Sequence, residues 1–163
     1  MTISLKHTGR RTGAVLVSLL LLLTLAVSAS AAAVKMTVGV RFWRESGDKE
    51  SMVDSAVDTT REATLTRQPN GTFTLELPVK QLSSMNMTGC LTGIAIGEVN
   101  YDGTLSGDLS NGTAVLTLKN LPASVLTGSD SSKALAVTCS IKMDTILLGD
   151  ISTSAKMSIW VER

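Results

Sequence analysis

The chain has 163 residues, of which 15 are Lys or Arg and 14 are Asp or Glu, so its formal net charge is +1. A charge so close to zero argues against a nucleic-acid-binding surface and against attraction to an anionic membrane. The single histidine, His7, lies at the N-terminus, so the remainder of the chain cannot support Ser-His-Asp catalysis, Cys-His catalysis or a metal site built on imidazole.

The first 33 residues have the pattern of a secretory signal peptide. Lys6, Arg10 and Arg11 precede an apolar run over residues 14–27, and small residues follow at positions 28–33. The apolar run is shorter than the roughly 20 residues of a membrane-spanning helix. We therefore predict a signal over residues 1–33 and one domain over residues 34–163, secreted or associated with the cell surface. The predicted domain has 12 basic and 14 acidic residues, a formal net charge of −2.

Apolar and polar residues begin to alternate directly after the predicted signal. Residues 34–42 place Val, Met, Val, Val and Phe on one face, as in a half-buried strand. Residues 45–60 are charged or small and predict a loop with one helical turn at 51–55. Alternation resumes on both sides of Pro69-Asn70-Gly71, which predicts a hairpin over residues 63–77.

The second half of the chain has short apolar runs separated by turn signals. We predict strands at residues 89–101, 104–109, 114–118, 134–143 and 156–161, with turns at Asp102-Gly103 and Asn111-Gly112. No segment keeps a helical period. The sequence therefore predicts an all-β protein, an antiparallel immunoglobulin-like β-sandwich of about eight strands with one short helical turn.

Two cysteines, Cys90 and Cys139, lie in the predicted domain. An even number of cysteines in a secreted protein predicts a disulfide between them. Two free buried thiols are the main alternative, and a metal or redox role is a third, although there is no Cys-x-x-Cys motif.

Few residues of the predicted domain can carry chemistry. The acidic residues include no pair spaced as an acid and base couple, so we expect no enzymatic activity. The acidic residues of the loop at 45–60 lack the ligand spacing of a calcium loop and are interpreted as solvated. The methionines are the remaining candidates, because a thioether is a soft ligand for Cu(I) and for haem iron, with core filling as the alternative. They are Met52, Met85, Met87, Met143 and Met157, apart from Met36 in the first strand.

Several segments together resemble a NEAT domain, the haem-binding module of Gram-positive cell-surface iron uptake. They are VRFWRESGDKESMVDSAVDTTREATLTRQPNGTFTLEL, MNMTGCLTGIAIG, IKMDTILLG and KMSIWVE. The resemblance covers residues 35–162. It implies a β-sandwich with a haem slot between the short helix after the first strand and the hairpin of the last two strands.

The resemblance also implies roles for individual residues. Ser51 would bond a haem propionate, although helix N-capping explains it as well. Met52 would lie over the distal haem face. The iron ligand of the family is the first Tyr of a Tyr-x-x-x-Tyr motif in the last strand, and those two positions fall at Ile151 and Ala155. The only tyrosine, Tyr101, lies elsewhere.

Because neither position is a tyrosine, three interpretations follow from the resemblance. Haem would be held by thioethers, with Met52 and Met157 as candidate iron ligands, although Met157 also fits the core face of its strand. Alternatively, the domain binds a protein without a cofactor, as a haemoglobin-binding or adhesion module. The third interpretation is an extracellular Cu(I)-binding protein. We predict a haem-binding domain for capture or relay in iron acquisition, with a haemoprotein or another haem-relay protein as its partner.

Overall fold

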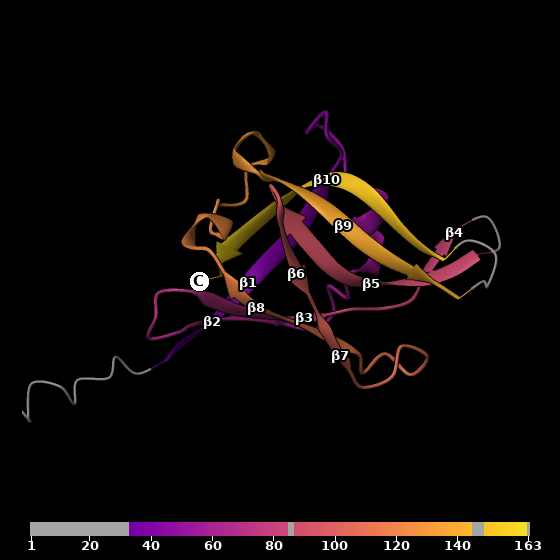
Figure 1. The fold of residues 1–163 in the computed structure, drawn as a ribbon, viewed down its shortest axis with the longest axis horizontal. Helices are drawn as coiled ribbons and strands as arrows, with labels where there is room; N and C mark the ends of the chain where they lie inside the picture. Colours follow the sequence, from indigo (N-terminus) through magenta and orange to yellow (C-terminus); the bar gives the residue numbers. More distant parts are fainter. Residues whose placement is uncertain (1–32, 85–86, 145–148, 163) are drawn as a thin grey trace, which may run out of the picture. The chain divides into compact units, whose positions relative to one another are not determined.

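The computed structural model describes residues 33–84, 87–144 and 149–162, so nearly all of the predicted signal segment lies outside the described residues. The described part consists almost entirely of antiparallel strands (Figure 1). Three short 3-10 helices accompany them: η1 (Met52–Ala56), η2 (Ala123–Val125) and η3 (Ser131–Lys133). The strands are β1 (Val34–Trp43), β2 (Ala63–Arg67), β3 (Phe73–Pro78), β4 (Leu82–Ser84), β5 (Met87–Ile96), β6 (Val99–Asp102), β7 (Thr104–Ser106), β8 (Val115–Leu121), β9 (Leu135–Met143) and β10 (Asp150–Val161).

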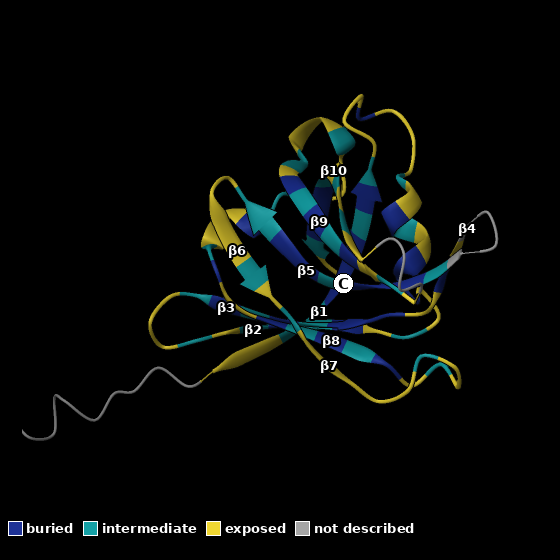
Figure 2. Cartoon of the chain, turned by 45° about the vertical axis from the view of Figure 1, so that its right-hand side comes forward, coloured by how far each residue is buried: buried dark blue, intermediate teal, exposed yellow. Residues whose placement is uncertain are grey.

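The strands form two layers that share β1. The order is β4-β5-β9-β10-β1-β2-β3-β8-β7, and β6 pairs with β5. The first half of β1 pairs with β2 and the second half pairs with β10, with Val38 as the residue common to both ladders. Figure 2 shows β2, β3, β7 and β8 lying across one layer, with β5, β9 and β10 rising above them. This arrangement confirms the predicted all-β sandwich.

The chain crosses between the layers a second time at Gly103, between β6 and β7. The N–H of Gly103 donates to the carbonyl oxygen of Thr92 at 2.8 Å. A Cβ at Gly103 would overlap the side chain of Leu116 and lie 2.8 Å from the same carbonyl oxygen. Because both neighbours are packed in the sandwich, only glycine fits at this crossing.

The core contains the inward-facing residues of the alternating strands, which hold the two layers together. In β1, Val38, Val40 and Phe42 are buried, as the alternation predicts. The predicted strand at 89–101 is in fact a hairpin, because a turn at Gly97-Glu98 divides it into β5 and β6. The largest fully buried side chains are Phe42, Leu65, Leu75, Leu77, Leu91, Ile94, Leu116, Leu118, Leu121, Ile141, Met157 and Ile159.

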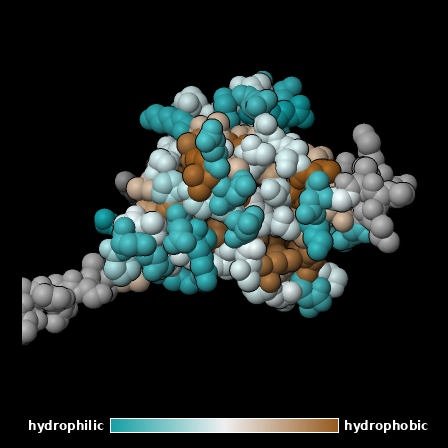
Figure 3. Space-filling view, viewed as in Figure 1, coloured by the Kyte–Doolittle hydropathy of each residue, from teal (hydrophilic) through white to brown (hydrophobic). Residues whose placement is uncertain are grey.

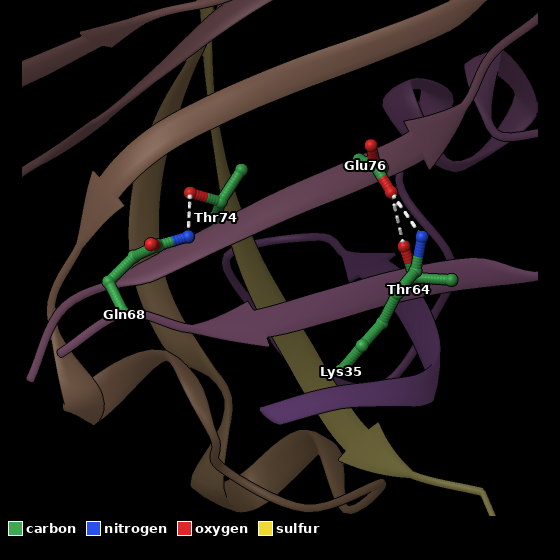
Figure 4. Close-up of polar contacts among 5 residues, drawn as sticks. All are labelled: Lys35, Thr64, Gln68, Thr74 and Glu76. Carbon is green, nitrogen blue, oxygen red and sulfur yellow. Dashed lines mark hydrogen bonds and ion pairs between the residues drawn. The ribbon is translucent and has the colours of Figure 1, made fainter. Parts of the chain in front are cut away.

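The outward face of β1, β2 and β3 is polar (Figure 4). The Nζ of Lys35 forms an ion pair with Glu76 Oε2 at 2.9 Å, and the Thr64 hydroxyl donates to the same oxygen at 2.7 Å. Just beyond the end of β2, the Gln68 amide donates to the Thr74 hydroxyl of β3 at 3.1 Å. These residues alternate with core-facing residues of the same strands, so the period of two in the sequence reflects one buried face and one solvated face.

The predicted disulfide is wrong, because Cys90 and Cys139 are free thiols. Cys90 lies opposite Lys142, and Cys139 lies opposite Ile94. Directly opposed residues share a face of the sheet. Lys142 is exposed and Ile94 is buried in the core, so the two thiols point to opposite faces. They are also offset by three residues along the strands, roughly 10 Å, beyond the reach of a disulfide.

Candidate functional site

The helix η1 corresponds to the helical turn that the sequence predicts. Ser51 is its N-cap in an extended conformation, and its Oγ accepts a hydrogen bond from the N–H of Val53 at 3.4 Å. Val53 and Ala56 are fully buried, whereas Met52 is 48% exposed. The helix therefore anchors one face in the core and holds the Met52 thioether out toward solvent.

Two hydrogen bonds fasten η1 to the edge of β1. The N–H of Ser51 donates to the carbonyl oxygen of Phe42 at 2.8 Å, and the N–H of Phe42 donates to Asp54 Oδ1 at 2.7 Å. At Phe42, β1 has already left β2 and pairs only with β10. The segment at Ser51–Asp54 therefore satisfies edge groups that a neighbouring strand would otherwise bond.

The environment of Asp54 opposes its ionisation. Burial raises the pKa of this carboxyl above its usual value, and the hydrogen bond from the Phe42 N–H opposes that rise. The neighbouring Glu50 raises the pKa further, whereas Arg41 and Lys80 lower it. Asp54 consequently has a structural role at the base of η1, in contrast to the solvated loop position predicted for it.

The other end of η1 is joined to the segment between β3 and β4. The N–H of Lys80 donates to the carbonyl oxygen of Ala56 at 2.9 Å, and Val57 forms an isolated bridge with Val79. The helix also contacts β4 and β5. It is therefore held at both ends on the strands that it covers.

The β9–β10 hairpin carries the remaining predicted site residues. Ile151 pairs with Ile141, Ala155 with Val137, and Met157 with Leu135. Ile151, Ala155 and Met157 alternate along β10 and share its core-facing side. Ile151 is half-buried, Ala155 is 1% exposed and Met157 is fully buried.

The structure brings some of the predicted site residues together and separates others. Ser51 and Met52 are adjacent at the start of η1. Met157 pairs with Phe42, whose backbone bonds Ser51, so Phe42 of β1 lies between Met157 and the start of this helix. Ile151 is six residues before Met157 on the same strand, roughly 20 Å away.

Met143 on β9 is a further methionine on the core-facing side of the hairpin. It lies opposite Gly89 and is half-buried. A Cβ on Gly89 would lie 2.9 Å from its sulfur, so the glycine leaves room for the thioether. Sequence reasoning considered Met143 without selecting it, although its period-two spacing from Ile141 indicated the same face.

Within residues 33–84, 87–144 and 149–162, no group of three or more His, Cys, Asp or Glu side chains is placed to hold a metal ion. Three acidic residues of the loop at 45–60 have local hydrogen-bond donors: Ser46 bonds Asp48, Thr60 bonds Asp58, and the Phe42 N–H bonds Asp54. In the same described part of the chain, no helix is long and apolar enough to cross a membrane.

Comparison with known proteins identifies the fold. No protein-family model matches this sequence, and no curated protein matches it. Two similar solved structures are the NEAT5 domain of IsdX2, a B. anthracis hemophore, in complex with heme, and a single-site mutant of the same domain, also with heme. In each case the TM-score is 0.50 at 9% sequence identity, over 80% of this chain and 98% of the other. The described domain of this chain therefore has a NEAT-like fold.

Proposed function

We propose that this chain is an extracellular haem-binding domain that captures or relays haem in iron acquisition. The observation that supports this proposal is the position of Met52 on η1, where the residue is 48% exposed. The fold around it is similar to that of a haem-bound hemophore domain. Met52 then supplies the iron ligand at this end of the sandwich. The domain acts by binding rather than by catalysis, and it exchanges haem with a haemoprotein or with another relay protein.

The residues around η1 fit this role with a ligand set different from a tyrosine phenolate. Ile151 and Ala155 carry no donor atom, so neither can ligate iron. The Ser51 oxygen already accepts from the Val53 N–H, which leaves its O–H free to donate to a propionate. Bound haem supplies a redox-active iron, and a soft thioether favours the ferrous state.

The second predicted thioether has a different environment. Met157 has no exposed surface and lies between Phe42 and Leu135 in the sheet. Iron ligation by Met157 would require β10 or η1 to move. We therefore assign ligation to Met52 and core packing to Met157, and we propose that Met143 and Ile151 contribute apolar contacts.

Haemin added to the purified protein tests the proposal. After removal of excess haemin on a desalting column, the absorption spectrum is recorded in the oxidised and reduced states. We expect a retained Soret band that shifts or disappears in Met52→Leu, which removes the sulfur and keeps the size. Met36→Leu on β1 is the matched control and should leave the spectrum unchanged. A protein that stays colourless in both states refutes the proposal.

A cofactor-free protein-binding module is the second candidate function. It is favoured by the missing donors at Ile151 and Ala155. On the face in Figure 3, hydrophobic residues form small patches separated by hydrophilic ones, which is ordinary for a protein surface and favours neither candidate. A colourless protein that binds haemoglobin or another surface protein would support this candidate. Stoichiometric Cu(I) binding lost in Met52→Leu would instead support the copper alternative.

A further inference from the structure

A cavity of about 240 Å³ lies against the outward face of the β1–β10 ladder. Its walls come from β1, the end of β10 and the segment after η1 at residues 57–63. Residues that bear charge or an aromatic ring line it, namely Arg41, Asp58, Arg61, Glu62, Trp160 and Glu162. None of the residues proposed above for haem binding lines this cavity, so its role is independent of haem.

Trp160 is the aromatic wall of the cavity. It pairs with Gly39 across the ladder, and a Cβ on Gly39 would overlap the six-membered ring of the indole. The missing Cβ therefore seats the ring directly on the β1 backbone. The other tryptophan, Trp43, donates its indole N–H to Ser158 Oγ at 3.0 Å. The indole N–H of Trp160 has no such partner among the described residues.

A buried carboxylate faces the same space. Asp58 is only 9% exposed, and its Oδ1 accepts from the N–H and hydroxyl of Thr60 at 3.1 and 2.7 Å. These hydrogen bonds lower the pKa of Asp58 despite its burial, so the group is ionised at neutral pH. Its Oδ2 receives no hydrogen bond from any described residue. This oxygen faces the cavity wall without a donor from the described residues and can accept a hydrogen bond from a ligand.

The remaining charges leave the cavity net negative. Glu62 and Glu162 form no ion pair within the described part of the chain. Of the two arginines, Arg41 pairs with Glu50 at 3.4 Å. Arg61 donates to the carbonyl oxygens of Gly112 and Ala114 at 2.9 and 3.0 Å. The three carboxylates and two guanidinium groups that line the cavity leave it with a formal net charge of −1.

We propose that this cavity binds an organic cation, with an alkylammonium group over the face of Trp160 and its charge balanced by Asp58, Glu62 and Glu162. An indole face attracts cations through its quadrupole, and the attraction increases as the cation is desolvated. The same carboxylates repel an anionic ligand. A neutral ligand of equal shape can also contact Trp160. It lacks the cation–π attraction and the attraction to the carboxylates, so it should bind more weakly.

Titration of the purified protein with choline chloride tests the site. The two indole N–H signals in a ¹⁵N-edited NMR spectrum report on the two tryptophans separately, once Trp43→Phe and Trp160→Phe have assigned them. We expect the Trp160 signal to shift and saturate in the millimolar range while the Trp43 signal stays in place. The neutral isostere 3,3-dimethylbutan-1-ol should shift the Trp160 signal far less at the same concentration, and an equal concentration of NaCl should leave both signals unchanged.

Charge-neutralising variants separate a specific site from a general attraction. Glu62→Gln and Glu162→Gln should each weaken choline binding about two- to fivefold. Glu98→Gln makes the same change in the β5–β6 turn, outside the cavity, and should have no effect. An unmoved Trp160 signal, equal binding of the neutral isostere, or equal weakening in Glu98→Gln would each overturn the proposal. The isostere comparison uses the unsubstituted protein, so it stands even if a variant fails to fold.

Discussion

The carboxylate of Asp54 accepts a hydrogen bond from the backbone N–H of Phe42 at 2.7 Å, and this contact fixes η1 on the edge of β1. The bond joins a residue of η1 to β1, the strand that belongs to both layers. Together with the Ser51–Phe42 and Lys80–Ala56 backbone bonds, this part-buried carboxylate sets the position of the helix that presents Met52.

Asp54→Ala tests this dependence. Loss of the acceptor leaves the Phe42 N–H without a partner at a partly buried position, so we expect the free energy of unfolding to fall by about 1–3 kcal/mol. Asp54→Asn keeps an acceptor oxygen and should lose less. Chemical denaturation of the three proteins measures the difference. An alanine variant as stable as the asparagine variant would show that the hydrogen bond contributes nothing.

The Asp54 carboxyl should also make the free energy of unfolding depend on pH in a direction that can be predicted. Because burial raises the pKa of Asp54 in the folded protein, the folded state binds more protons than the unfolded state just above the usual pKa. Stability contributed by this group therefore falls as pH rises through that window and grows as pH falls. Relative to Asp54→Asn, the unsubstituted protein should gain stability on acidification. A constant difference between the two proteins across that range contradicts the assignment.

Gly103 should be intolerant of a side chain. In Gly103→Ala, the new Cβ meets a backbone carbonyl and the buried Leu116 at the crossing between layers, so we expect a loss of about 1–3 kcal/mol or more. Gly71→Ala is the comparison, because it has a φ of +84° but no neighbour within 4 Å. That strain alone costs about 1 kcal/mol. Thermal unfolding should rank Gly103→Ala as the less stable variant.

The two cysteines should behave as protected thiols. Burial raises the pKa of Cys139 to about 12 and also raises the pKa of Cys90, so little thiolate forms at pH 8. A colorimetric thiol reagent should react slowly with the native protein and detect two thiols after denaturation without reductant. The unfolding temperature should not change with reductant. If no thiols were detected in denaturant, the two cysteines would have to form a disulfide after all.

Met52 and Met157 should separate binding from stability. Met157 is fully buried, so Met157→Ala should cost about 2–5 kcal/mol. Met52→Ala removes a half-exposed side chain and should change stability by less than about 0.5 kcal/mol. If Met52 ligates haem, Met52→Ala should change the haem absorption spectrum more than Met157→Ala does. Equal destabilisation by the two substitutions would show that Met52 packs in the core after all.

Patterns among neighbouring residues in the sequence correctly predicted the elements that depend mainly on contacts between residues close together in the chain. The alternation at residues 34–42, the hairpin around Pro69-Asn70-Gly71 and the capped turn at Ser51 all appear in the structure. The strand predicted at residues 104–109 is shorter, because β7 ends at Ser106. Sequence reasoning missed β4, which has only three residues and too few positions to show a period.

The sequence by itself determined that this chain forms an antiparallel β-sandwich, because a period of two along its longer strands indicates one face toward a core and one toward solvent. Only the tertiary structure decided which strands pair and in which register. That register puts Cys90 and Cys139 on opposite faces, buries Met157 while Met52 stays exposed, and gathers Asp58, Glu62 and Trp160 around one cavity. These relationships join residues far apart in the chain, and their energies depend on packing between layers, which spacing along the sequence does not encode.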